Sequence, residues 1–168
     1  MGVIQYRCAK CGEMHEGLPA IGFAEPAYIY AIPTEDRKGR VKLSDDLCTA
    51  DEHYFIRCVL KVPIVGHDEA FEWGVWCSAS QASFERYVDS FDDHDQSKLG
   101  GWFGYLCNGL PSYRDTQGLH CNVQPQDDRK RPLVELQDGD HALVHDQRSG
   151  ISMERAMEFV GLLENCVH

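Results

Sequence analysis

The sequence predicts an α+β fold, a mostly antiparallel sheet packed by two helices, in one domain over residues 1–168. Long stretches alternate apolar and polar residues with a period of two, which is typical of half-buried strands. Two other segments repeat apolar residues at helical spacing. The strand-like stretches follow one another in a run and do not alternate with helices, which favours an α+β fold over a doubly wound one.

Composition and charge exclude several classes of protein. Hydrophobic residues make up 43% of the 168-residue chain and charged residues 26%, which is ordinary for a globular protein. The formal net charge of −11 disfavours binding to nucleic acid and to anionic membrane surfaces. No apolar run approaches the roughly 20 residues of a membrane span, and the N-terminus lacks the pattern of a secretion signal. We therefore expect a cytoplasmic protein.

Residues 1–25 are rich in glycine and cysteine, and we expect a loop-rich N-terminal lobe without regular elements ahead of a core over residues 26–168. The core begins with a predicted short strand over residues 28–32. A helical turn follows near Thr34, whose hydroxyl is suited to cap it. Another short strand is predicted over residues 40–43.

The strongest strand signals lie at residues 53–64 and 70–79, which we interpret as the two strands of a hairpin. In the first strand Tyr54 and Ile56 share one parity while Arg57 has the other. In the second strand Trp73 and Trp76 have opposite parity, so at most one of them is expected on the main core face.

Two helices are predicted to cover the sheet, one over residues 81–91 after Ser80 and one over residues 153–166 after Ser152. Both serines are good N-cap residues. Short apolar runs within residues 101–110, 118–124 and 131–137 predict further strands. Asp140 is expected to cap a short helix that ends before Gly150.

The sharpest chemical signal is the pair Cys8 and Cys11, followed by Gly12. Two thiolates at this spacing can bind one tetrahedral metal ion, so we predict a zinc site that clamps the lobe. His15 is the predicted third ligand, and Cys48, in a polar and turn-like segment, the predicted fourth. Two alternatives remain open: a pair of reduced thiols without metal, and a redox pair, although a redox pair usually opens a helix after a strand.

A second candidate site lies on the other face of the hairpin, where Arg57, Glu72 and Trp76 are expected to project. A guanidinium can pair with a carboxylate and stack on an indole ring, so these residues would line a small-molecule cleft if another segment covers them. The alternative is a second, minor core with a buried ion pair.

Other constellations carry weaker signals. His141 and His145 would share a face of a helix, but the glutamate of the zinc-protease motif is absent, and a solvated helix face is the simpler interpretation. A Cys48 nucleophile paired with His53 or His141 has no supporting motif.

The ordered motifs CAKCGEMHEGLP, SDDLC, EWGVWCSAS, LPSYRDTQGL, RPLVEL and HALVHDQRSGIS cover almost the whole chain. The sequence resembles a bacterial domain family of unknown function, number twenty-one ninety-nine. This resemblance implies a stand-alone bacterial protein and no particular activity. Cys58 and Ala142 stand where the family commonly has Gly and Pro. The residues of the family pattern are Cys8, Cys11, Gly12, His15, Gly17, Leu18, Pro19, Asp46, Cys48, Trp73, Gly74, Trp76, Arg131, Pro132, Glu135, His141 and Gln147.

Zinc held by four side chains has no open position for water, which is the mark of a structural site. The leading hypothesis is therefore a zinc-containing module that binds an unknown small molecule or protein. The rival hypothesis is an enzyme, either a hydrolase whose zinc keeps an open position in place of His15 or Cys48, or a thiol-dependent one.

Overall fold

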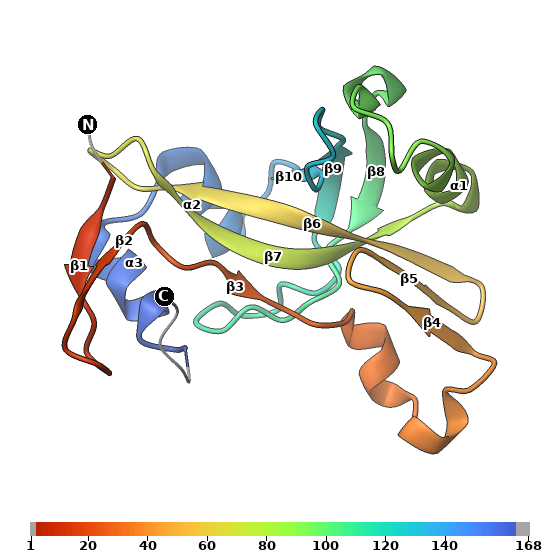
Figure 1. The fold of residues 1–168 in the computed structure, drawn as a ribbon, viewed down its shortest axis with the longest axis horizontal. Coiled ribbons are helices and arrows are strands. Elements are labelled where there is room, and N and C mark those ends of the chain that lie inside the picture. The colour runs from red at the N-terminus through yellow and green to blue at the C-terminus, as the bar shows by residue number, and fades with distance from the viewer. Residues whose placement is uncertain (1–2, 164–168) are drawn as a thin grey trace. The chain divides into compact units, whose positions relative to one another are not determined.

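The computed structural model describes residues 3–163 and confirms the mixed α+β class, with helices and a mostly antiparallel sheet (Figure 1). Its strands are β1 (Gln5–Arg7), β2 (Met14–Glu16), β3 (Ile21–Gly22), β4 (Val41–Leu43), β5 (Leu47–Ala50), β6 (His53–Pro63), β7 (Ala70–Ala79), β8 (Trp102–Tyr105), β9 (His120–Gln124) and β10 (Leu133–Leu136). Its α-helices are α1 (Gln81–Asp89), α2 (Ala142–Ser149) and α3 (Met153–Val160), and its 3-10 helices are η1 (Ala27–Ala31), η2 (Thr34–Asp36) and η3 (Gln96–Leu99).

The chain divides into two compact units, which are described separately. Unit 1 comprises Met1–Ile21, Lys61–Trp73 and Asp140–His168, and unit 2 comprises Gly22–Leu60 and Gly74–Gly139. The N-terminal lobe predicted over residues 1–25 corresponds to only one of the three segments of unit 1. The assignment of the whole chain to one domain stays a prediction.

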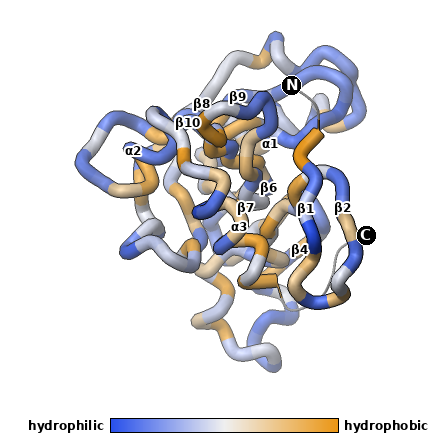
Figure 2. The backbone as a smooth tube through the Cα atoms, turned by 90° about the vertical axis from the view of Figure 1, so that its left-hand side faces the viewer, coloured by the Kyte–Doolittle hydropathy of each residue, from blue (hydrophilic) through white to orange (hydrophobic). Residues whose placement is uncertain are grey.

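The larger sheet has the strand order β3-β7-β6-β10-β9-β8, and β5 joins β4 to β6. Within unit 2, β9 is antiparallel to both β8 and β10, while β10 is parallel to β6 where Leu133 faces Val59. A bridge between Cys77 and Leu106 also connects the end of β7 to the chain just after β8. Figure 2 shows hydrophobic segments along the strands and many hydrophilic segments in the outlying loops.

Unit 2 contains a core cluster around Trp76, which is fully buried. The Trp76 indole N–H donates to the carbonyl of Phe23 at 2.9 Å, and the Trp76 backbone N–H donates to Asn108 Oδ1 at 2.7 Å. The alternation of buried and partly exposed residues along β7 ends here, since Val75, Trp76 and Cys77 are all buried. The cluster comprises Ile29, Ile32, Cys48, Ala50, Phe55 and Trp76.

Unit 1 contains an aromatic core. Phe71 and Trp73 from β7 lie with ring centroids 5.2 and 5.1 Å from that of Phe159 in α3, and all three side chains are fully buried. Trp73 and Trp76 are therefore both core residues, in different units. The expectation that at most one of them lies on the main core face concerns one face of the strand, and the second tryptophan is buried elsewhere.

Several predicted elements are confirmed. β6 and β7 are hydrogen-bonded neighbours and match the predicted hairpin. Ser80 and Ser152 cap α1 and α3 by accepting the backbone N–H of Ser83 and Arg155. The end of the second predicted helix, over residues 164–166, lies outside the described residues.

Other predicted elements are wrong. The segment predicted as a strand at residues 28–32 forms η1, because Ile29 and Ile32, three residues apart, both turn into the core. The N-terminal lobe does contain regular structure, the paired strands β1 and β2. His141, and not Asp140, caps α2, since its Nδ1 accepts the backbone N–H of Leu143 at 3.0 Å.

Within residues 3–163, no helix is long and apolar enough to cross a membrane.

Candidate metal centre

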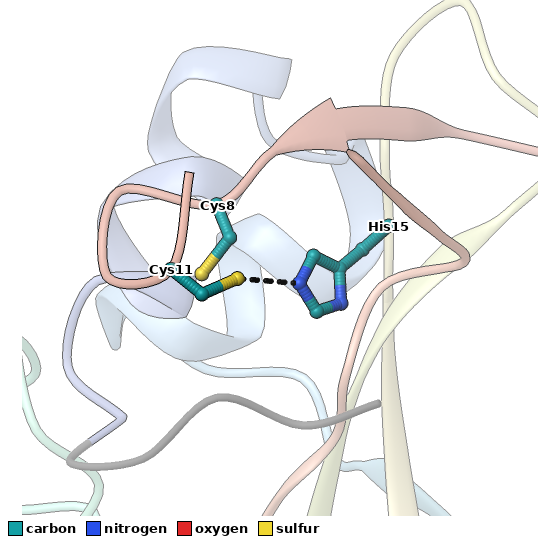
Figure 3. A group of neighbouring side chains, drawn as sticks. All are labelled: Cys8, Cys11 and His15. Carbon is teal, nitrogen blue, oxygen red and sulfur yellow. Dashed lines mark hydrogen bonds between the residues drawn. The ribbon is translucent and has the colours of Figure 1, made fainter. Parts of the chain in front are cut away.

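The candidate metal centre lies at the closed end of the β1–β2 hairpin in unit 1 (Figure 3). The two strands are antiparallel and pair Tyr6 with His15. Cys8 directly follows β1, Cys11 lies in the turn, and His15 lies in β2. The strand pairing therefore returns the histidine to the level of the two cysteines, although it is four residues beyond Cys11.

Backbone hydrogen bonds shape the turn that carries the cysteines. The N–H of Cys8 donates to the carbonyl of Glu13 at 2.8 Å, and the N–H of Gly12 donates to the carbonyl of Cys8 at 2.8 Å. Gly12 has a φ of +75°, a conformation that glycine adopts readily. The N–H of Lys10 points at Cys8 Sγ at 3.4 Å, an orientation that stabilises negative charge on the sulfur.

The three side chains converge on one point. Their ligand atoms all lie within 4.8 Å of one another, and Cys11 Sγ is 3.2 Å from His15 Nε2. With metal bonds of about 2.0–2.3 Å, the ligand atoms of a tetrahedral zinc ion are roughly 3.5–3.8 Å apart. Small rotations of the cysteine side chains would therefore suffice to receive the ion.

The surroundings favour metal binding by His15. Its side chain is 8% exposed, and its ring stacks on Tyr6 with centroids 5.5 Å apart and an interplanar angle of 18°. The ring is thus held in one orientation, with Nε2 directed at the thiols. Cys8 is partly buried and Cys11 is exposed, so an ion can enter from solvent on the side of Cys11.

Cys48, the predicted fourth ligand, does not belong to this group of ligand atoms. It lies in β5 of unit 2, is 1% exposed, and packs in the core cluster around Trp76. Burial raises the pKa of the Cys48 thiol to about 11, which disfavours the thiolate that a metal requires. These surroundings indicate a packing role, and its role as a ligand stays a prediction.

The predicted cleft residues have different surroundings. The Arg57 guanidinium lies 6.0 Å from the centroid of the Trp76 ring, as expected for stacking. Trp76 is fully buried, which favours the minor core over an open cleft. Burial, and then the nearby Arg131, lower the pKa of Arg57. Glu72 belongs to unit 1 and is partly exposed, so its pairing with Arg57 stays a prediction.

The polar anchor of the hairpin was not found from the sequence. Glu69, in the turn before β7, accepts the backbone N–H of Ile4 at 2.8 Å and that of Leu18 at 3.0 Å. Its carboxylate thereby fixes the chain on both sides of the β1–β2 hairpin. A single glutamate in a polar turn carries no pattern that could have identified this role.

A cavity of about 260 Å³ lies beside the candidate metal centre, between the cysteine turn and α3. Its lining includes Cys8 together with the last turn of α3, and most of the lining is apolar. No sequence pattern predicted this cavity, because it is lined by segments that are far apart along the chain.

Comparison with known proteins gives one finding. No curated protein and no solved structure matches the chain. The model of the family described as "Uncharacterized protein conserved in bacteria (DUF2199)" matches residues 7–151, which include all three side chains of the candidate centre. The chain therefore belongs to this bacterial family, as its motifs predicted.

Proposed function

We propose that the protein is a zinc-binding module in which Cys8, Cys11 and His15 hold one Zn²⁺ ion and thereby stabilise unit 1. The observation that carries this proposal is the convergence of three ligand atoms within 4.8 Å, at the end of a hairpin whose turn is already hydrogen-bonded. Two thiolates and an imidazole are ligands that zinc prefers.

A structural role follows from how little else holds the hairpin. β1 and β2 have three residues each, and two-stranded hairpins are marginally stable in water on their own. Glu69 anchors the two ends of the hairpin, but its turn reaches into solvent. A metal ion at the turn would fix the end that Glu69 leaves open.

Metal analysis of the purified chain tests this proposal directly. We expect one zinc per chain by native mass spectrometry, and loss of zinc in the variants Cys11→Ser and His15→Ala. His94→Ala, which replaces an exposed histidine of unit 2, is the matched control and should retain the ion. A wild-type chain that remains metal-free after incubation with zinc would refute the proposal, and Cys48→Ser tests the predicted fourth ligand.

The module's ligand, an unknown small molecule or protein, is a separate part of the proposal. Arg57, Glu72 and Trp76 remain the residues proposed to contact that ligand, and the minor core, which the burial of Trp76 favours, remains the alternative. We also propose that the protein works in the cytoplasm, where thiols stay reduced and available to a metal.

One observation favours a second function, a hydrolase with an open zinc site. Within residues 3–163, three side chains form the candidate group, and two cysteines with one histidine are the protein ligands of some catalytic zinc sites. A fourth position occupied by water would support this function, whereas a fourth protein ligand would support the purely structural one. X-ray absorption at the zinc edge distinguishes these coordination shells. The thiol-dependent alternative has less support, because the pKa of Cys48 is raised and His141 caps α2.

A further inference from the structure

We propose that the cavity beside Cys8 binds the apolar chain of a small carboxylic acid, whose carboxylate takes the fourth position on the metal. This inference rests on the proposed zinc site. It adds a ligand class and a place for that ligand, both built from described residues of unit 1.

The first step concerns coordination. The group of ligand atoms contains three side chains among residues 3–163, while zinc in proteins is usually bound by four ligands. Cys8 belongs to this group and also lines the cavity. A molecule in the cavity therefore lies next to a metal ligand.

The second step concerns shape and polarity. The cavity has a volume of about 260 Å³, slightly below the usual range of roughly 300–1,000 Å³ for drug-sized ligands, so it suits a smaller molecule. Most of its wall is made by uncharged side chains, which favours a hydrocarbon chain over a sugar or a peptide backbone. These are Tyr6, Ala9, Pro19, Met157, Val160 and Leu163.

The third step concerns charge. A zinc ion with two thiolates and a neutral imidazole has no net charge, so the metal alone does not select an anion. Arg7 and Lys10 also line the cavity, and they supply two positive charges beside its apolar wall. An anionic head group with an apolar tail, as in a medium-chain carboxylate, matches this combination.

The test uses the full chain loaded with Co²⁺, whose visible absorption responds to each ligand bound, and octanoate as the probe. We expect octanoate to shift the cobalt bands with a saturable dependence on concentration. The same titration by calorimetry should give at least tenfold weaker binding to the metal-free chain.

Two tryptophan substitutions on α3 test the location. Val160→Trp fills the cavity and should weaken octanoate binding at least tenfold, while Co²⁺ is retained. Met153→Trp on the same helix is the matched control and should change binding less than twofold, because Met153 does not line this cavity. Lys10→Glu, which reverses a charge that lines the cavity, should also weaken octanoate binding.

The outcomes separate two failures. A chain that binds no Co²⁺ refutes the zinc proposal itself. A chain that binds Co²⁺ but whose spectrum ignores octanoate refutes only the carboxylate site, as does equal binding by wild type and Val160→Trp. Weaker thiolate-to-cobalt absorption in Cys48→Ser than in the wild type would show that a thiolate already occupies the fourth position, and it would also overturn the carboxylate site. The same result in Cys166→Ser would have the same meaning; Cys166 lies outside the described residues.

Discussion

The β1–β2 hairpin of unit 1 and the core of unit 2 are stabilised in different ways. In unit 2, Trp76 and its neighbours are buried, and both N–H groups of Trp76 donate internal hydrogen bonds. Of residues 3–20, only Ile4 and His15 are buried. A segment of this kind gains little from apolar burial, so the Glu69 carboxylate anchor and, in our proposal, a bound metal ion stabilise it.

The comparison explains why cysteines have different roles in the same chain. Cys48 is buried among apolar side chains, where a raised pKa keeps its thiol protonated. Burial likewise raises the pKa of Cys107 to about 12. Cys8 and Cys11 lie on a polar turn with a backbone N–H directed at sulfur. The surroundings of each thiol therefore separate the packing role from the metal-binding role that we propose.

The largest effect is expected from Trp76→Ala, which should lower the free energy of unfolding by about 3–5 kcal/mol, because it leaves a cavity in the core of unit 2. Urea unfolding followed by circular dichroism measures this change. Phe103→Ala, at a ring that is 45% exposed, is the control, with an expected loss of about 1 kcal/mol or less. A Trp76→Ala protein as stable as the wild type would show that this cluster is not a true core.

Removal of zinc should act locally. After chelation, the amide protons of residues 3–18 should lose protection from hydrogen exchange, while those of β9 and β10 keep it, since those strands belong to unit 2 and pair with each other. Zinc can contribute on the order of several kcal/mol to the folding of such a lobe. Exchange followed by mass spectrometry, with and without chelator, measures this difference, and equal loss in both units would contradict it.

A smaller effect is expected at the polar anchor. Glu69→Ala removes the acceptor of two backbone N–H groups, those of Ile4 and Leu18, and should cost about 1–3 kcal/mol. Glu69→Gln keeps one acceptor oxygen and should lose less. Chemical unfolding of the zinc-loaded protein measures both changes, with Glu13→Ala at an exposed position of the cysteine turn as the control. Equal stability of Glu69→Ala and wild type would mean that water replaces the carboxylate.

The sequence predicts much of this fold where local signals agree. The β6–β7 hairpin is visible from alternation over two long stretches, and Ser80 and Ser152 mark helix starts through their capping chemistry. The strand predicted at residues 28–32 is wrong because a short apolar run does not distinguish alternation from the burial of Ile29 and Ile32 one helical turn apart.

The candidate site likewise has parts that local sequence signals predict and parts that they do not. The spacing of Cys8 and Cys11 identifies a ligand pair, and His15 joins them because a hairpin pairs residues that are close in sequence. No local sequence pattern identifies ligands or anchoring residues that come from distant segments of the chain. Glu69 contacts the hairpin from 51 and 65 residues away, and the cavity beside Cys8 needs α3, so only the folded chain reveals them.

The smallest effect concerns an exposed ion pair in unit 2 that depends on pH. Asp51 accepts hydrogen bonds from Arg40 Nε at 2.9 Å, from Arg40 Nη2 at 3.0 Å and from the Tyr28 hydroxyl at 3.0 Å. The hydrogen bond from Arg40, followed by that from Tyr28, lowers the pKa of Asp51 below its ordinary value. Since the lowered pKa belongs to the folded state, the carboxylate stabilises the fold above its unfolded-state pKa of about 3.9.

This stabilisation is lost as the pH falls through the lowered pKa of the folded state, where Asp51 becomes protonated in both states. We therefore expect Asp51→Asn to destabilise the protein slightly at pH 7 and to match the wild type at the acid end. Urea unfolding at a series of pH values from neutral to acid measures this convergence. Salt should shrink the difference at pH 7, because the pair is exposed and screened by ions. Asp92→Asn is the control, since Asp92 accepts from a single guanidinium nitrogen of Arg129. A difference in the free energy of unfolding between Asp51→Asn and the wild type that persists at acid pH would contradict the electrostatic origin.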